Sequence, residues 1–238
     1  MSEVKQFTFT EEQLAKLMTM QDELNTYIHP EWKLQNFDWN TAIIDECQEI
    51  LEHLGWKWWK KGYRTGLTEG NKAQVQLEVI DILHFLISLD VQEGVKAADL
   101  LALVNGGFCS NNIWATVDWV RNDAATGTLT MCMWAELAHS VDLTTEQVLE
   151  TYTQKFVLNK FRQDHGYKDG SYVKEWDVLA AAGGIVDGVG TNYVYQTLED
   201  NQVLAKTVHH LKVDGLDTTD ETLLYSRLEQ RYNSRLNK

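Results

Sequence analysis

The sequence predicts an all-α fold, a helical bundle built around a carboxylate site for a metal ion. Two observations favour helices: apolar residues recur at helical spacing through most of the 238 residues, and there is no sustained alternation with a period of two. The chain also contains a single proline, Pro30, so one common cause of helix breaks is nearly absent. We expect one domain over residues 1–238.

The expected helices are separated by glycine-rich loops. Two helix starts have a clear cause, because Thr10 in "TEEQ" and Thr144 in "TTEQ" both resemble capping boxes. The stretches "KKGYRTGLTEG", "NGGF" and "AAAGGIVDGVGTN" predict loops, and the last is long enough to be functional or an insertion. With boundaries uncertain by about 2 to 4 residues, helices are expected at 9–29, 38–55, 72–91, 96–105, 111–121, 129–140, 144–164, 197–211 and 218–235.

Composition excludes several classes of protein. The 35 acidic and 21 basic residues give a net charge of -14, which is unsuited to duplex nucleic acid or an anionic membrane. The cysteines, Cys47, Cys109 and Cys132, form no CxxC pair, which fits a reducing compartment. The N-terminal residues do not resemble a signal peptide, and no apolar stretch approaches 18 residues. We therefore expect a cytoplasmic protein.

One apolar helix carries acidic residues that need a partner. In "EVIDILHFLISL", Glu78 and Asp81 share a narrow stripe of a helix that is otherwise almost entirely apolar. Burying an unpaired carboxylate costs several kcal/mol, so a cation is a better explanation for this stripe than a solvated helix face.

A second acidic pair lies in "NTAIIDECQEILEHL", where Glu46 and Glu49 flank an apolar face. Taken alone, this pair is better explained as a solvated helix face. If the two helices pack side by side, however, four carboxylates converge and require a metal ion to offset their repulsion. Oxygen ligands without cysteine favour Mg²⁺ or Mn²⁺, and Mg²⁺ keeps coordination positions for phosphate oxygens.

Basic and amide side chains follow at helical spacing in "YTQKFVLNKFRQDHGYKDGSY". Lys155, Asn159 and Arg162 share one helical face, and Tyr167 and Lys168 follow in a turn. This combination suits triphosphate oxygens. The alternative, when the segment is considered by itself, is an ordinary solvated basic face.

Together these segments resemble a known family. "ECQE" followed by "EVID" has the ExxE and ExxD form of the all-α nucleoside triphosphate pyrophosphohydrolases. The later "KFVLNKFRQDHGYKDGSYVKEW" and "EDN" are similar to the dimeric all-α dUTPases. The resemblance covers roughly Leu14 to Tyr167 and resumes at Glu199 to Asn201.

The resemblance implies a homodimeric, Mg²⁺-dependent enzyme that hydrolyses dUTP, and also dUDP, with attack at the β-phosphorus and release of dUMP and pyrophosphate from dUTP. It implies Glu46, Glu49, Glu78 and Asp81 as metal ligands, with Glu46 or Glu49 also activating water. It further implies that Lys155, Asn159, Arg162, Tyr167 and Lys168 bind phosphates, and that Gln21, Asn25, Trp58 and His84 line the nucleoside pocket. Considered without the family, Trp58 and His84 are more simply explained as structural residues.

One departure and three alternatives stay open. The segment "DVLAAAGGIVDGVGTNYVYQTL", at 177–198, separates two elements that lie close together in the family, which leaves the role of Glu199, Asp200 and Asn201 undecided. The substrate could instead be dCTP or a broad range of nucleotides. "ELAH" at Glu136 to His139 also fits a helical di-iron or other metal-binding bundle. The third alternative is a helical partner-binding protein without chemistry.

Overall fold

The computed structural model describes residues 7–106, 112–181 and 193–234. The chain forms two compact units, Met1–Tyr152 and Thr153–Lys238, and each is described by itself. The all-α prediction is confirmed: among the described residues most elements are helices, and only two short strands form a sheet. That the chain behaves as one domain stays a prediction.

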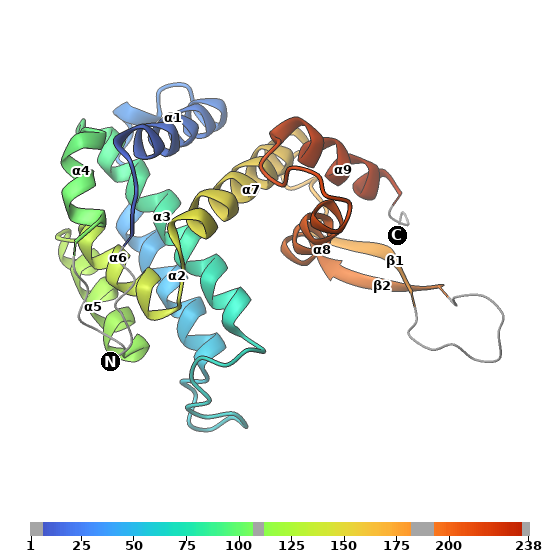
Figure 1. The fold of residues 1–238 in the computed structure, drawn as a ribbon, viewed down its shortest axis with the longest axis horizontal. Coiled ribbons are helices and arrows are strands. Elements are labelled where there is room, and N and C mark those ends of the chain that lie inside the picture. The colour runs from blue at the N-terminus through green and yellow to red at the C-terminus, as the bar shows by residue number, and fades with distance from the viewer. Residues whose placement is uncertain (1–6, 107–111, 182–192, 235–238) are drawn as a thin grey trace. The chain divides into compact units, whose positions relative to one another are not determined.

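The first unit consists of helices (Figure 1). The helix starts expected at Thr10 and Thr144 are confirmed, because each hydroxyl accepts from the backbone N–H three residues on while a glutamine caps the threonine N–H in return. The elements are α1 (Glu11–Ile28), the short 3₁₀ helix η1 (Trp32–Leu34), α2 (Trp39–Leu54), α3 (Lys72–Glu93), α4 (Ala97–Val104), α5 (Ile113–Thr126), α6 (Met131–Ser140) and the first part of α7 (Thr145–Asp164).

Helix α3 lies in the core of this unit. It packs against α1, α2 and α6, and Figure 1 shows it alongside α2. Apolar side chains are buried on almost every side of it, as the sequence suggested: Val75, Val79, Ile80, Ile82, Leu83, Leu86 and Ile87. A polar group on this helix is therefore either buried or held in a narrow surface strip, which makes its partners informative.

The loop between α2 and α3 closes on itself near the start of α3. Gly55 ends α2 with φ +79°, and a Cβ there would collide with the carbonyl oxygen of Gly62. The N–H of Arg64 donates to the Gly55 carbonyl at 2.7 Å, and the amide of Asn71 donates to the carbonyls of His53 and Gly66 at 2.9 and 2.8 Å. These bonds tie the end of α2 to the beginning of α3.

The second unit holds the rest of α7, then β1 (Glu175–Ala181), β2 (Tyr193–Glu199), α8 (Asp200–Val213) and α9 (Glu221–Asn233). The strands are antiparallel, with Glu175 opposite Glu199 and Trp176 opposite Leu198. The helix expected to begin at 197 begins at Asp200, a difference within the uncertainty of the predicted boundaries, but the hairpin before it was not predicted. Buried and more exposed residues do alternate in β1, where Trp176 and Val178 are buried. This alternation is too short to outweigh the helical pattern of the surrounding sequence.

Some sequence features fall partly outside the described residues. Of the expected insertion at 177–198, residues 177–181 and 193–198 form most of the hairpin, and 182–192 lie outside the described residues. Cys109 also lies outside them, whereas Cys47 and Cys132 are free thiols. Within the described ranges no helix has both the length and the apolar character to cross a membrane.

Candidate functional site

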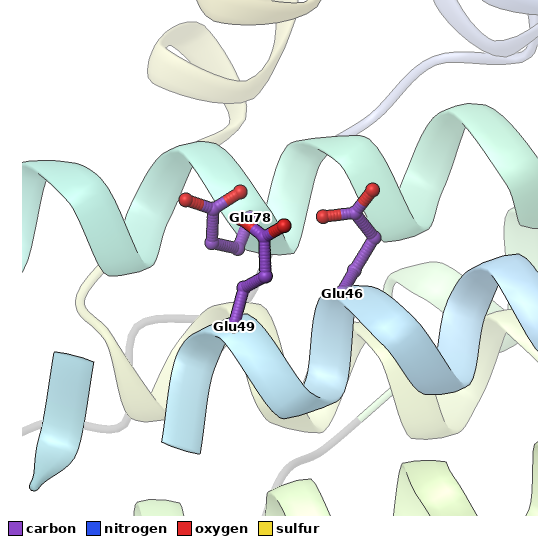
Figure 2. A group of neighbouring side chains, drawn as sticks. All are labelled: Glu46, Glu49 and Glu78. Atoms are coloured by element: carbon purple, nitrogen blue, oxygen red, sulfur yellow. The ribbon is translucent and has the colours of Figure 1, made fainter. Parts of the chain in front are cut away.

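Three of the four predicted metal ligands converge between α2 and α3. Figure 2 shows Glu46 and Glu49, one turn apart on α2, facing Glu78 on α3. One carboxylate oxygen from each residue lies within 4.8 Å of the others. Asp81 lies one helical turn beyond Glu78 on α3, is half-buried, and is not part of this group of three. The structure therefore brings together acidic residues 32 positions apart in the sequence, such as Glu46 and Glu78.

The three carboxylates differ in their exposure to solvent. Glu49 is exposed and Glu46 half-buried, whereas Glu78 has only 6% of its surface exposed. Glu78 contacts His53 on the last turn of α2, with Nε2 and Oε1 3.2 Å apart. Since a carboxylate can only accept, the Nε2–H of His53 is the donor. The loop bond from Asn71 to the His53 carbonyl holds the backbone of this partner.

His53 was missed at the sequence level, although a signal exists. It lies seven residues after Glu46 and four after Glu49, which places all three on the same face of α2. A histidine at that spacing beside acidic residues is a reasonable partner for a carboxylate on a neighbouring helix. It was overlooked because a single histidine near a helix end has little weight by itself.

The donor set of the triad fits a divalent metal ion. Three like charges within 4.8 Å repel one another, and a cation between them would offset this repulsion. All three potential ligands are carboxylate oxygens, and the group contains neither sulfur nor imidazole. Mg²⁺ and Mn²⁺ prefer oxygen ligands of this kind. Exposed Glu49 leaves one side of the group open to solvent and hence to a substrate.

A buried polar network joins three of the four predicted nucleoside residues. Gln21 Nε2 donates to Asn25 Oδ1 at 3.0 Å, and Gln21 Oε1 lies 2.7 Å from Nδ1 of His84. The network continues through two residues outside the predicted set: Asn25 donates to the Ser88 hydroxyl at 2.9 Å, and the Tyr152 hydroxyl donates to Gln21 Oε1 at 2.8 Å. The first turns of α7 and the middle of α3 therefore fix the amides presented by α1.

The chemistry of this network assigns its protons. Burial raises the pKa of Tyr152 well above its ordinary value, so this phenol stays a donor. Gln21 Oε1 can only accept, so it accepts from both Tyr152 and Nδ1–H of His84. The His84 ring also stacks on Tyr152, with centroids 3.8 Å apart. Both amides are thereby held in one orientation.

Trp58 is placed differently from the other three. It lies on the loop after α2, with 73% of its surface exposed, and its ring meets the edge of Trp59 with centroids 5.7 Å apart. Gln21, Asn25 and His84 are buried, at 3%, 6% and 4% exposure. The structure thus joins these three residues but leaves Trp58 outside their network.

In the second unit, Arg162 is held by hydrogen bonds rather than solvated. Its Nε and Nη2 donate to Asp200 at 2.8 and 2.9 Å, and its Nη1 donates to Asn159 at 3.0 Å. The ring of Tyr167 lies 5.9 Å from the guanidinium carbon. Burial acts to raise the pKa of Asp200, but the hydrogen bonds and charge of Arg162 outweigh it and hold that pKa below its ordinary range.

Lys155 is likewise enclosed, with 2% of its surface exposed, and its Nζ donates to Asn201 Oδ1 at 3.1 Å. Lys168 is exposed in the turn after α7. An ordinary solvated basic face is therefore wrong for Lys155 and Arg162. Both have oxygen partners on the first turn of α8, the segment "EDN" whose role the sequence left undecided.

Comparison with known protein families identifies a match. A family model described as dUTPase matches residues 13–167. This range contains the carboxylate triad, the amide network and the segment from Lys155 to Tyr167. No curated protein matches the chain. The match favours nucleotide hydrolysis over the di-iron alternative based on Glu136 and His139 and over a partner-binding protein without chemistry.

Proposed function

Because the chain belongs to the dUTPase family, and is therefore a dUTP diphosphatase, we propose that it hydrolyses dUTP to dUMP and pyrophosphate with Mg²⁺. The observation that carries the proposal is the convergence of Glu46, Glu49 and Glu78 from two helices. dUTPases generally use a divalent metal ion, and an all-carboxylate group suits one. Mn²⁺ is the alternative ion, and dUDP is a further proposed substrate.

The metal residues are proposed to be Glu46, Glu49, Glu78 and Asp81. These residues would hold Mg²⁺, which would supply positive charge against the phosphate oxygens and make an attacking water more acidic. Glu46 or Glu49 accepts the proton of the attacking water, and the exposure of Glu49 gives this carboxylate access to solvent. His53 keeps the buried Glu78 carboxylate oriented through its 3.2 Å contact.

Phosphate binding is proposed for Lys155, Asn159, Arg162, Tyr167 and Lys168. A guanidinium and an ammonium bind phosphate oxygens by charge-assisted hydrogen bonds, which strengthen as negative charge shifts toward the leaving oxygen. Attack at the β-phosphorus makes dUMP the leaving group. This charge stabilisation acts on phosphates and so leaves the choice of base to other residues.

Base recognition is proposed for Gln21, Asn25 and His84, with Trp58 stacking on the base. Uracil presents an O4 acceptor and an N3–H donor, and a side-chain amide satisfies both. The network to Ser88 and Tyr152 already orients these amides, so little conformational entropy is lost when substrate binds. We further propose a homodimer, on the basis of the family resemblance, and a cytoplasmic location, on the basis of cysteines that fit a reducing compartment.

The experiment is a nucleotide panel with Mg²⁺, read by pyrophosphate release, for wild type and Glu49→Gln. We expect wild type to prefer dUTP and Glu49→Gln to lose at least about 100-fold in turnover, since general-base catalysis alone contributes about 10²- to 10⁴-fold. Asp45→Asn is the matched control, because it removes one negative charge from an exposed position on the same helix outside the triad.

Two results would contradict the proposal. Near-normal turnover of Glu49→Gln at saturating Mg²⁺ would remove this residue from the metal site. Equal rates on dCTP and dUTP at low concentration would replace the uracil assignment with a dCTP-directed or broader nucleotide pyrophosphohydrolase.

A further inference from the structure

Asp200 is a completely buried carboxylate that the proposed function does not use. It is the first residue of α8, with 0% of its surface exposed. Its Oδ2 accepts from Arg162 Nε at 2.8 Å and from the Tyr172 hydroxyl at 2.9 Å, and its Oδ1 accepts from Arg162 Nη2 at 2.9 Å. The carboxylate therefore meets one edge of the guanidinium with two parallel hydrogen bonds.

This arrangement fixes the direction of the guanidinium. A bidentate pair defines the plane of the group as well as its position, and the third bond, from Nη1 to Asn159, limits rotation further. Removing two charges from water is costly, and an ion pair of this kind is weak evidence for stability alone. Precise orientation of the arginine is a benefit that an apolar pair of similar volume could not supply.

Asp200 is itself held rigidly. Its backbone N–H donates to the carbonyl of Lys174 at 3.0 Å, immediately before β1, and β2 ends at the preceding residue. The next residue, Asn201, accepts from Lys155 Nζ. Two consecutive residues at the start of α8 thus contact the two enclosed cations of α7, so the hairpin and α8 determine where both cations lie.

We propose that Asp200 is a positioning residue for the dUTPase reaction, which holds the Arg162 guanidinium in the orientation required by the transferring phosphates. The proposal rests on the proposed phosphate role of Arg162. Without this carboxylate the long arginine side chain would sample several rotamers. Small displacements of an oriented group lower the rate of reaction substantially. Asp200 acts through Arg162 and does not itself touch the substrate.

The test compares Asp200→Asn, Arg162→Ala and the double variant for kcat, KM and the affinity for α,β-imido-dUTP measured by calorimetry. In Asp200→Asn the arginine keeps its charge but loses its bidentate partner. We expect kcat to fall about 10- to 100-fold, while the affinity for the anionic analogue changes less than about threefold because no cation is lost. The number of analogue molecules bound per protein chain, obtained from the same titration, shows whether the lower kcat comes instead from a smaller fraction of folded protein.

The double variant provides the sharper result. With Arg162 already replaced by alanine there is nothing left to orient, so adding Asp200→Asn should change kcat/KM by less than about twofold. It should also raise the melting temperature, because Arg162→Ala leaves the buried Asp200 carboxylate without its counterion. If Asp200→Asn costs the same factor with and without Arg162, its role is general and the proposal is overturned.

Further variants keep the outcome clear. Asp200→Glu is the substitute variant if Asp200→Asn fails to fold. It retains the negative charge but displaces the guanidinium by the length of one methylene, so it should lower kcat. A wild-type kcat in Asp200→Glu would overturn the proposal. Tyr225→Phe removes another phenol–carboxylate bond to α7, at exposed Asp164, and should retain activity. If Arg162→Ala lowers kcat/KM but Asp200→Asn does not, only this inference fails. If Arg162→Ala has no effect, its proposed phosphate role fails as well.

Discussion

Under the proposed function, single residues decide which base the site accepts. Asn25 is 6% exposed and bonded to Gln21 and Ser88, so its amide has a fixed orientation. A flat ring such as Trp58 stacks on any base and supplies affinity without discrimination. If Trp58 stacks on the base as proposed, we expect the discrimination between uracil and cytosine to come from the donors and acceptors of the oriented amides.

Asn25→Ala should accordingly lose more activity on dUTP than on dCTP. An unmatched polar edge in a closed pocket costs about 1 to 3 kcal/mol, which corresponds to roughly 10- to 100-fold in kcat/KM. Trp58→Ala, in contrast, should weaken both substrates alike. The measurement is kcat/KM for the two nucleotides in each variant, and an equal loss on both substrates in Asn25→Ala would exclude this amide from base selection.

A second residue-scale effect concerns stability and pH. Burial, together with the negative charge of Glu93, raises the pKa of Asp90 to about 7, and its Oδ2 is buried without a hydrogen-bond partner among the described residues. An unfolded carboxyl group has a pKa of about 3.9. Between about pH 4 and 7 the folded protein therefore binds a proton that the unfolded chain has released, so the free energy of unfolding falls as pH rises through this window.

Asp90→Asn should remove this loss, since an amide does not titrate. The gain in stability should be small at pH 5 and larger at pH 8, with an upper bound of ~4 kcal/mol set by the difference between the two pKa values. Urea unfolding of both proteins at the two pH values measures it. An identical difference at pH 5 and pH 8 would show that ionisation of Asp90 is not its cause.

At the scale of elements, the sequence predicts the helices well because each carries its own signal. The capping boxes at Thr10 and Thr144 and the apolar character of α3 depend on residues within a few positions of one another. The hairpin could not be found in this way, because β1 and β2 are stabilised as strands by pairing with each other, and neither short segment carries a clear strand signal by itself.

The candidate site shows the same division. Helical spacing was enough to group Glu46 with Glu49 and Lys155 with Arg162. The contacts of Glu78 with His53 and of Arg162 with Asp200 join different elements, and so required the fold. Tyr152 gave no usable signal, because its role depends on Gln21, 131 residues away in the sequence.

The loop after α2 offers a test of how this element is built. Gly55→Ala introduces a Cβ against the carbonyl oxygen of Gly62 at φ +79°, so it should lower the free energy of unfolding by about 2 kcal/mol or more. Gly94→Ala at φ +76° is the matched control, because its Cβ meets no atom within 4 Å and only the backbone penalty of about 1 kcal/mol remains. Chemical denaturation compares them, and equal losses would show that the contact with Gly62 has no part.

For the whole molecule, charge is the dominant constraint. A chain with a net charge of -14 repels a nucleoside triphosphate, so the substrate can approach only where positive charge is concentrated. Under the proposed function Lys155 and Arg162 would supply some of that charge, although their partners Asp200 and Asn201 reduce its effect. A divalent ion at the carboxylate triad would supply the remainder, which links metal binding to both stability and substrate binding.

The course of α7 and the binding of Mg²⁺ together predict how the whole chain unfolds. Helix α7 runs from Thr145 to Asp164, through the division between the two units after Tyr152, so melting one unit should fray a helix that the other also uses. We expect a single calorimetric transition that Mg²⁺ moves to higher temperature as a whole. A Mg²⁺ concentration of 100 times the dissociation constant contributes ~2.7 kcal/mol to the free energy of unfolding. For a chain of this size, this raises the melting temperature by about 5 to 11 °C.

Glu49→Gln should raise the melting temperature without metal, because it removes one of three like charges within 4.8 Å, and it should abolish most of the Mg²⁺ shift. Asp45→Asn changes the net charge equally but should keep that shift, which separates metal binding from general charge reduction. Two transitions, of which Mg²⁺ moves only one, would mean that the units unfold separately. The expectation of a single domain over residues 1–238 would then be wrong, whereas the metal site would stand.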